Sequence, residues 1–460
     1  MKSKVGFDMK KLIISFAIAF IGCIGLFAVK TYAGELDIDI SASDGSNGGY
    51  LKDDTISTTE HFDGGATITI STAEPMDSVY IKWDIAPGVW QLDAGGTKIN
   101  CGANNYLHEY VKLPQKTTSV TMTMPSNGVE IADIYAFSEG ELPDFVQQWQ
   151  PSWDKADVLV LSAHADDDVL FFGPLIEIYG AEKQARVQVV YFTNMAYTEN
   201  YRCHELLEGL WAMGIRNYPY TMSIQDAYSE TIDGAIANLN MSEEQALGEV
   251  VGVIRRFKPQ VLVLHDVNGE YGHGQHMLSC EFGKRALDIC PDASQYADSA
   301  SQYGVWNVPK CYIHLYGEKQ IKLDTRSPLS AFGGMSALDV AKAAYLKHES
   351  QQYAWFYVDD TYEYSCADFG LFRSLVGDDT GNDILENIIP YDKQIVEPET
   401  TAPEKPAPKE PEKKSNSLVI ILIIIAVIIV IVVVLFIIYK KNVNKKKRRK
   451  KQQNTRRRYR

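Results

Sequence analysis

The first part of the chain contains short runs in which apolar and polar positions alternate. Four such runs lie at residues 66–70, 79–83, 119–124 and 129–134, and clusters of Gly, Pro, Asn and Asp separate them. Alternation with a period of two is typical of strands that bury one face. We therefore predict an antiparallel β-sandwich over residues 34–150.

From residue 157 onwards the apolar runs become nearly continuous. The runs 158–161, 187–192 and 261–264 contain almost no polar residue, which is typical of parallel strands that are buried on both faces. Apolar residues at helical spacing lie between these runs, for example at 202–213 and 247–254. Strands and helices are thus expected to alternate along this part of the chain.

A further helix is expected to begin after Ser336, which can cap it together with Asp339, and to run through His348. Alternating strands and helices predict a Rossmann-like, doubly wound α/β domain with a mostly parallel sheet over residues 151–392. The Gly-rich turn of nucleotide-binding α/β domains does not follow the first strand, which argues against a nucleotide site.

Both ends of the chain carry patterns typical of membrane segments. Lysines precede an apolar run and small residues follow it, so residues 1–33 are predicted to be a signal peptide; the alternative is an uncleaved anchor. The 21 apolar residues Leu418–Ile438 match the roughly 20 that span a bilayer, which predicts a transmembrane helix at 417–439. The proline-rich segment 393–416 is expected to be an extended linker.

The distribution of charge predicts the orientation of the chain in the membrane. The formal net charge is −14, yet the tail 440–460 holds 13 Lys and Arg and no acid. A basic tail favours the cytoplasmic side, so we expect a single-pass protein of the cell membrane whose body is extracellular. The acidic body argues against nucleic-acid binding. Six of the seven cysteines follow the predicted signal peptide, and no spacing identifies partners among them.

Candidate chemistry gathers where two predicted strands end. The strand 158–161 leads into Ser162-Ala163-His164-Ala165-Asp166-Asp167-Asp168, and the strand 261–264 leads into the loop 265–276, so four of the nine histidines lie in these two loops. Ligand sites form at the carboxyl ends of such strands. Two histidines and one carboxylate with an open position are a catalytic zinc arrangement.

These loops resemble those of a known family. His-x-Asp-Asp at 164–167 and Gly-His-x-x-His at 272–276 resemble the paired motifs of the PIG-L (LmbE-like) deacetylases. The resemblance covers about residues 155–380, including Arg202-x-x-Glu205 and the stretch 345–351. It implies a zinc-dependent enzyme that removes acetyl groups from N-acetylglucosamine-containing glycans or glycoconjugates.

The resemblance also implies roles for individual residues. It gives His164, Asp167 and His276 as ligands of zinc, although another divalent ion would suit the same donors. It gives Asp166 as the general base and His273 as the group that stabilises the oxyanion or protonates the leaving amine. Arg202 is implied as a substrate contact. The dipole of a helix beginning after Gly272 would favour a neutral His276, the form that binds metal.

Three positions depart from the family pattern. Ala165, Asp168 and Gln275 stand where the family usually has Pro, Glu and Asp. The change at 275 matters most, because an acid there would orient and charge the adjacent catalytic histidine, whereas an amide can only orient it. The alternative function is therefore a catalytically impaired, glycan-binding surface protein.

Several residues have a simpler interpretation beside the functional one. Arg202 and Glu205 are three apart on one predicted helix, so they could form a surface ion pair. We interpret His265 and Asp266 as a loop pair without function, and His348 as a hydrogen-bonded structural histidine. The aromatic residues of 80–110 are expected in the core. The strand 130–137 resembles the last strand of galactose-binding-like sandwiches, which implies a carbohydrate-binding domain or, equally, a spacer.

Overall fold

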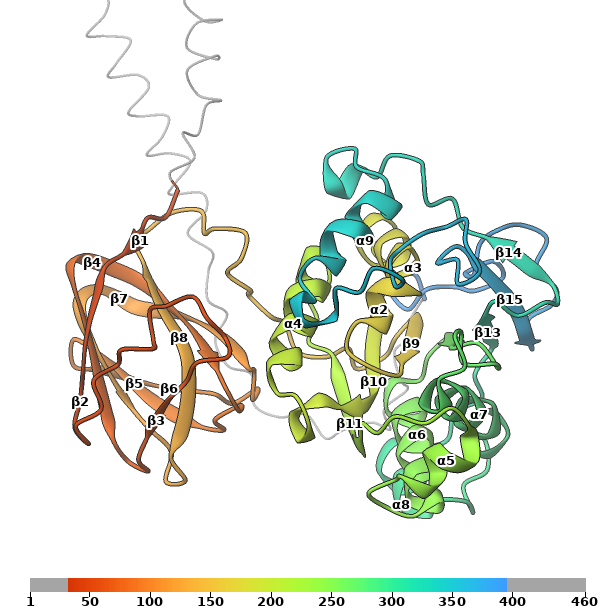
Figure 1. The fold of residues 1–460 in the computed structure, drawn as a ribbon, viewed down its shortest axis with the longest axis horizontal. Coiled ribbons are helices and arrows are strands. Elements are labelled where there is room, and N and C mark those ends of the chain that lie inside the picture. The colour runs from red at the N-terminus through yellow and green to blue at the C-terminus, as the bar shows by residue number, and fades with distance from the viewer. Residues whose placement is uncertain (1–31, 395–460) are drawn as a thin grey trace, which may run out of the picture. The chain divides into compact units, whose positions relative to one another are not determined.

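The computed structural model describes residues 32–394, and Figure 1 shows them in colour. Almost all of the predicted signal peptide, the predicted transmembrane helix and the basic tail lie outside this range, so these assignments stay predictions. Between residues 32 and 394 no helix combines the length and the hydrophobicity that a bilayer crossing requires.

The N-terminal region is an all-β domain, as predicted. Its eight strands form one hydrogen-bonded network in which β4 and β7 are the long central members, so the two expected sheets are joined rather than separate. The strands are β1 (Glu35–Leu36), β2 (Ile38–Ala42), β3 (Glu60–Phe62), β4 (Thr67–Trp83), β5 (Trp90–Ala94), β6 (Thr97–Cys101), β7 (His108–Thr123) and β8 (Val129–Phe137).

The long strand β4 explains how the layers are connected. Its first part pairs with β2, its last part pairs with β8, and its register to β7 shifts between Ser71 and Ser78. Such irregularities bend a strand and let it pass from one layer to another. The aromatic side chains Tyr80, Trp83 and Trp90 are buried here, which confirms that they belong to the core.

The second domain contains a seven-stranded sheet in the order β11-β10-β9-β12-β13-β15-β14. The five strands from β11 to β13 are mutually parallel, and β15 is antiparallel to both of its neighbours. The strands are β9 (Val158–Ser162), β10 (Val187–Asn194), β11 (Tyr220–Gln225), β12 (Val261–Leu264), β13 (Lys310–His314), β14 (Gln320–Lys322) and β15 (Asp368–Ser374). The predicted mostly parallel sheet is confirmed.

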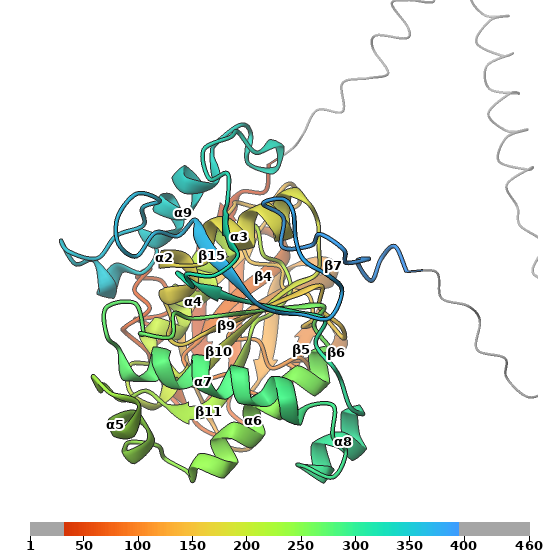
Figure 2. The same ribbon diagram turned by 90° about the vertical axis from the view of Figure 1, so that its right-hand side faces the viewer.

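Helices cover both faces of this sheet, with α5, α6 and α7 on one side and α2, α3, α4 and α9 on the other (Figure 2). They are α2 (Asp167–Leu170), α3 (Gly173–Ile176), α4 (Tyr201–Ala212), α5 (Ile232–Ala237), α6 (Glu243–Phe257), α7 (Gly274–Ile289), α8 (Ala297–Tyr303) and α9 (Ala337–Tyr345). A π-helical segment spans Glu177–Glu182, and short 3-10 segments span Met195–Tyr197, Ser330–Phe332 and Glu349–Gln351.

The continuous apolar character of the first strand follows from this layering. Val158 and Val160 pack into the core cluster that includes α3, α4 and α9, whereas Leu159 and Leu161 pack into the cluster of α6 and α7. Alternate side chains of a strand point to opposite faces. A strand between two helical layers therefore needs apolar residues at every position.

One helix boundary differs from the expectation. Helix α9 has Ser336 as its N-cap, as predicted, with the Asp339 N–H donating to the Ser336 hydroxyl, but it ends at Tyr345 and does not reach His348. The six cysteines between residues 32 and 394 are all free thiols, and five of them are buried. Within the described residues, therefore, no disulfide contributes to stability.

The topology places two loops side by side. From β9 the chain proceeds outwards through β10 to β11, and it then returns to form β12 on the other side of β9. Ligands bind at such a switch point, beyond the carboxyl ends of the strands. The loops that follow β9 and β12 meet there.

Candidate metal centre and active site

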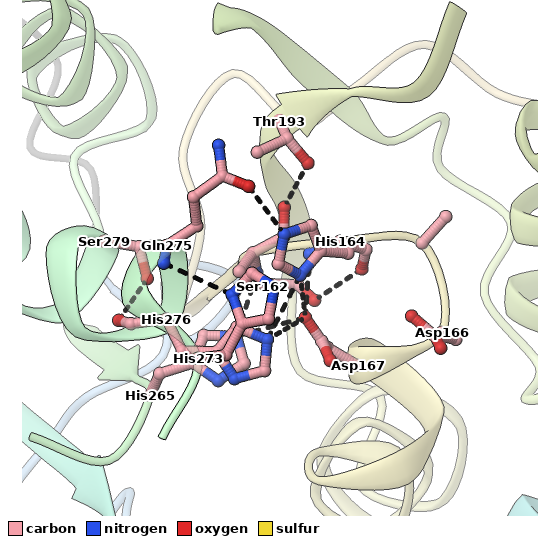
Figure 3. A network of polar contacts seen from close by, with 12 residues as sticks. Ser162, His164, Asp166, Asp167, Thr193, His265, His273, Gln275, His276 and Ser279 are labelled. Carbon is pink, nitrogen blue, oxygen red and sulfur yellow. Dashed lines mark hydrogen bonds and ion pairs between the residues drawn. The ribbon is translucent and has the colours of Figure 1, made fainter. Parts of the chain in front are cut away.

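The two loops bring side chains that are 112 residues apart into contact (Figure 3). His164 lies in the turn between β9 and α2, and Asp167 is the first residue of α2. His276 lies in the first turn of α7, and nine residues separate this helix from the end of β12. All three side chains are buried.

Three donor atoms converge at this point. Nδ1 of His164 lies 3.0 Å from Oδ2 of Asp167 and 3.1 Å from Nε2 of His276, and Nε2 of His276 lies 3.1 Å from the same carboxylate oxygen. Ligand atoms at about 2.0–2.2 Å from one zinc ion are separated by roughly 3.0–3.5 Å. The predicted ligands therefore fit a single divalent ion in donor type and spacing.

Neighbouring groups determine which nitrogen of His164 faces the cluster. Gln275 Oε1 accepts hydrogen bonds from His164 Nε2 at 3.0 Å and from the Ala227 N–H at 3.1 Å, while Gln275 Nε2 donates to the Gln225 carbonyl at 2.9 Å. These bonds fix the orientation of the amide. With a proton on Nε2, His164 keeps Nδ1 available for an ion.

Gln275 thus acts differently from the expectation. Its side chain contacts His164, and only its backbone N–H reaches the other histidine, donating to His273 Nδ1 at 3.2 Å. A carboxylate does reach this ring: that of Asp226 lies 3.3 Å from His164 Nε2. Asp226 follows directly after β11, so a third strand end contributes to the centre.

The charges of the centre are strongly coupled. Burial alone would lower the pKa of His276, but Asp167 and Glu270 raise it to about 9. Burial likewise opposes protonation of His164, yet hydrogen bonds to Asp167 and Asp226 raise its pKa well above the usual value. These two carboxylates favour the protonated ring of His276 and so oppose the effect predicted for the helix dipole. An ion that binds here must displace protons.

Asp166 adjoins the ligands in a strained conformation. Its φ of 125° is unusual for a residue with a side chain, and such strain is often found at functional sites. Burial, followed by the charge of Asp167, raises the pKa of Asp166 to about 8, although Arg202 opposes this shift. A carboxyl group that titrates near neutral pH can both accept and donate a proton.

Arg202 and Glu205 are buried in α4 and serve separate partners. Arg202 Nη2 donates to the Ala165 carbonyl at 2.6 Å and to Asp166 at 3.1 Å, whereas Glu205 accepts from the N–H and hydroxyl of Ser350. The alternative of a surface ion pair is therefore wrong. The substrate role of Arg202 stays a prediction. What the structure shows is that its hydrogen bond to Asp166 holds that carboxylate in place.

His273 caps α7 and lies against both imidazole ligands. Its ring centroid is 4.6 Å from that of His164 and 4.8 Å from that of His276. Burial and the two neighbouring histidines lower the pKa of His273 to about 2. Because Nδ1 accepts the Gln275 N–H, the proton of the neutral ring is on Nε2, where it can donate a hydrogen bond.

The structure adds a buried carboxylate that the sequence did not single out. Glu270 Oε2 accepts from His276 Nδ1 at 2.7 Å, and Oε1 accepts from Nδ1 of His265 at 3.1 Å and of His314 at 2.9 Å. Burial opposes ionisation, but these histidines hold the pKa of Glu270 well below its usual value. Glu270 therefore stays ionised and fixes the Nδ1–H tautomer of His276.

Two histidines differ from their simpler interpretations. His265 is not an isolated loop residue, because its Nε2 accepts the Ala163 N–H at 2.8 Å and its ring connects the two site loops. His348 is buried, as expected, but neither ring nitrogen has a hydrogen-bond partner among residues 32–394. Burial lowers the pKa of His348 to about 3, so the ring is neutral.

Comparison with known proteins supports the resemblance drawn from the motifs. The PIG-L family model, described as GlcNAc-PI de-N-acetylase, matches residues 159–287, the segment from β9 into α7. The stretch therefore contains both loops of the centre. The predicted family resemblance is confirmed for this domain.

Curated relatives of the domain are named deacetylases. The 1D-myo-inositol 2-acetamido-2-deoxy-alpha-D-glucopyranoside deacetylase 1 of Catenulispora acidiphila is 26% identical over 34% of this chain and 54% of its own length. The corresponding enzyme of Thermobispora bispora is 29% identical over 34% of this chain and 57% of its own length. The chain thus spans somewhat more than half the length of these relatives.

Among solved structures, the N,N′-diacetylchitobiose deacetylase of Pyrococcus horikoshii matches 45% of this chain and 75% of its own, with 13% identity and a TM-score of 0.34.

Proposed function

Because residues 159–287 match the PIG-L family model, we propose that the protein hydrolyses the N-acetyl amide of an acetylated amino sugar. The substrate is a glycan or glycoconjugate of the N-acetylglucosamine type. Zinc is the proposed metal, held by His164, Asp167 and His276. The names of the curated relatives support this class of reaction.

One observation carries the proposal. Three buried donor atoms from two distant loops lie 3.0–3.1 Å from one another at the sheet's switch point. Two imidazoles and one carboxylate are the protein ligands of many catalytic zinc sites. Zinc in this place supplies Lewis-acid chemistry, because it polarises an amide carbonyl and lowers the pKa of water.

Asp166 is the proposed proton carrier. Its carboxylate takes a proton from the attacking water, and Arg202 keeps it in position through the bond to Oδ1. Because its pKa lies near neutrality, the protonated acid can then deliver a proton to the leaving nitrogen. Both steps use one side chain.

His273 is proposed to stabilise the oxyanion. The neutral ring presents Nε2–H beside the ligand histidines, and a positioned donor is worth most where negative charge develops. Its low pKa disfavours the other role, protonation of the leaving amine, because that role requires an imidazolium. Of the two predicted roles, the first is therefore the one we propose.

The alternative function is glycan binding without turnover. It was suggested by Gln275, which cannot charge its neighbour as an acid would. The Gln275 side chain contacts His164 and not His273, and Asp226 places a carboxylate 3.3 Å from the same nitrogen of His164. This contact supports the catalytic function over the alternative.

The proposed location is the outer face of a cell membrane. This part of the proposal depends on the sequence patterns of 1–33, 417–439 and 440–460, which lie outside the described residues. Membrane fractionation of expressing cells, with external protease as the probe, tests it. Cleavage of the body in intact cells supports the proposal, and complete protection contradicts it.

Acetate release tests the proposed reaction. The full chain, loaded with zinc, is incubated with N-acetylglucosamine and its β-linked oligomers, and acetate and free amine are measured. Release of both in equal amounts supports deacetylation. Saccharide binding without release of either product supports the non-catalytic alternative.

A further inference from the structure

An exposed group of aromatic side chains begins beside the metal centre. The segment 349–366 follows α9 and carries Trp355, Tyr353 and Tyr357 with 60%, 49% and 45% of their surface exposed. Trp355 is the one exposed tryptophan between residues 32 and 394. Large aromatic surfaces in contact with water often mark a binding site.

These rings are connected to the centre by direct contacts. The ring of Tyr271 lies 5.4 Å from that of His276 and 5.9 Å from that of Trp355, and Trp355 in turn stacks on Tyr353 at 6.1 Å with an angle of 28°. The row thus leads from a ligand histidine outwards to solvent. A molecule that reacts at the centre can extend along it.

A buried anchor holds the row in place. Phe356 is 4% exposed and packs on Phe171 at 5.8 Å and on Tyr271 at 5.2 Å. Phe171 is the C-cap of α2, the helix that begins with Asp167, and in Figure 1 the segment after α9 passes beside α2. These contacts therefore fix the position of the exposed rings relative to the metal centre.

A second branch of rings extends the same surface. Tyr364 lies 6.2 Å from Tyr271, Tyr362 lies 5.5 Å from Tyr364, and Tyr357 stacks on Tyr362 at 4.8 Å with an angle of 23°. Flat faces suit pyranose rings, because an aromatic face can cover the C–H face of a sugar while the hydroxyl groups remain hydrated.

The charge of the segment narrows the class of ligand. Residues 349–366 contain four acids and neither Lys nor Arg. Asp360 pairs with Arg326 and Asp359 with Lys342, so Glu349 and Glu363 set the charge of the segment. Acidic groups repel both anionic polysaccharides and anionic lipids. An N-acetylated oligosaccharide carries no charge, and its amine product is a cation that the acids do not repel.

We propose that Trp355 and Tyr353 form subsites for the sugars next to the reacting one, so that the preferred substrate is a neutral N-acetylated oligosaccharide rather than a single sugar. The inference rests on the proposed deacetylation only for the identity of the reacting sugar. Stacking itself can be measured without turnover.

Calorimetric titration tests the subsites, with the zinc-loaded full chain carrying Asp166→Asn as the parent so that the probes are bound without being hydrolysed. The probes are N-acetylglucosamine and its β-1,4-linked tetramer. The parent should bind the tetramer at least about tenfold more tightly than the monomer, and Trp355→Ala or Tyr353→Ala should reduce this ratio by about tenfold. Trp355→Phe should restore part of it, because it keeps a flat ring.

Tyr50→Ala is the matched control, since Tyr50 is a comparably exposed tyrosine (53%) in the β-domain. This variant should keep the parent ratio. An unchanged ratio in Trp355→Ala overturns the proposal, as does an equal loss of monomer and tetramer binding. Loss of binding to phosphatidylcholine vesicles in Trp355→Ala, with the ratio intact, would assign the rings to a lipid surface instead.

Acetate release separates this inference from the proposed function. If no saccharide is deacetylated but tetramer binding still depends on Trp355, the proposed reaction fails and the subsites remain. If monomer and tetramer are deacetylated with the same kcat/KM, with or without Trp355, the reaction remains and the subsites fail.

Discussion

The Glu270 carboxylate accepts a hydrogen bond from Nδ1 of His276 at 2.7 Å, while Nε2 of the same ring faces the proposed ion position. Carboxylates behind metal-binding histidines fix the tautomer and increase the basicity of the ligand nitrogen. The same carboxylate also binds His265 and His314. One buried charge therefore organises the histidine side of the centre.

Replacing Glu270 with Gln should weaken zinc binding. The amide keeps the size of the side chain but loses the charge that favours His276, so the Kd for zinc should rise about 10–100-fold. Competition with a chromogenic chelator measures this change on the metal-free protein.

Glu281→Gln is the control for this variant, because Glu281 lies on the same helix, is partly exposed and pairs with Lys284. The control should keep the parent Kd. Equal Kd values for Glu270→Gln and the parent would show that Glu270 does not support the ligand.

Replacing Asp166 with Asn should separate metal binding from chemistry. Asp166 is not one of the three proposed zinc ligands, so the zinc content of the variant should stay within about twofold of the parent. The rate of acetate release should fall at least about 100-fold, the usual contribution of a general base. Asp233→Asn, at an exposed position on α5, is the control. Undiminished release from Asp166→Asn would remove its assigned role.

Replacing His348 with Leu should reduce the sensitivity of the fold to acid. Burial holds the pKa of His348 at about 3 in the folded protein, below the value of about 6.5 in an unfolded chain. Below pH 6.5 the unfolded chain therefore binds the extra proton, and stability is lost as the pH falls towards 3. Between pH 7 and pH 5 the parent should lose about 2 kcal/mol at this residue.

His348→Leu should not show this loss of stability. At pH 7 it should be at least as stable as the parent, because it also removes two buried nitrogens without hydrogen-bond partners. Denaturant titrations at pH 7 and pH 5 measure the difference. His61→Leu, at an exposed ring, is the control. Identical losses in His348→Leu and the parent would contradict the account of the buried ring.

The sequence predicted the centre because its chemistry depends on local features. A continuous apolar run specifies a strand buried on both faces, and the polar residues that follow it must lie at the strand end, so His164 and His276 could be placed together. Glu270 was missed because its partners lie on separate segments and its loop position is typical of a solvated acid. Asp226 was missed because the strand before it, Tyr220–Gln225, is not continuously apolar, so the sequence did not predict a strand end there.

Other outcomes depend on tertiary packing that no local pattern reveals. The lack of hydrogen bonds at His348 follows from what packs around the ring, including Gly209 of α4. The side chain of Gln275 turns towards His164 because Gln225 and Ala227 bind its amide. Sequence spacing alone pointed to the adjacent histidine instead.

His164, Asp167 and His276 are proposed to bind one divalent ion. Equilibrium dialysis against zinc, followed by elemental analysis, measures this binding in the parent, in His164→Ala and Asp167→Ala, and in the exposed control Asp233→Asn. One zinc per chain in the parent and the control, with almost none in the two ligand variants, is the predicted result. Equal zinc content in all four proteins would contradict the claim.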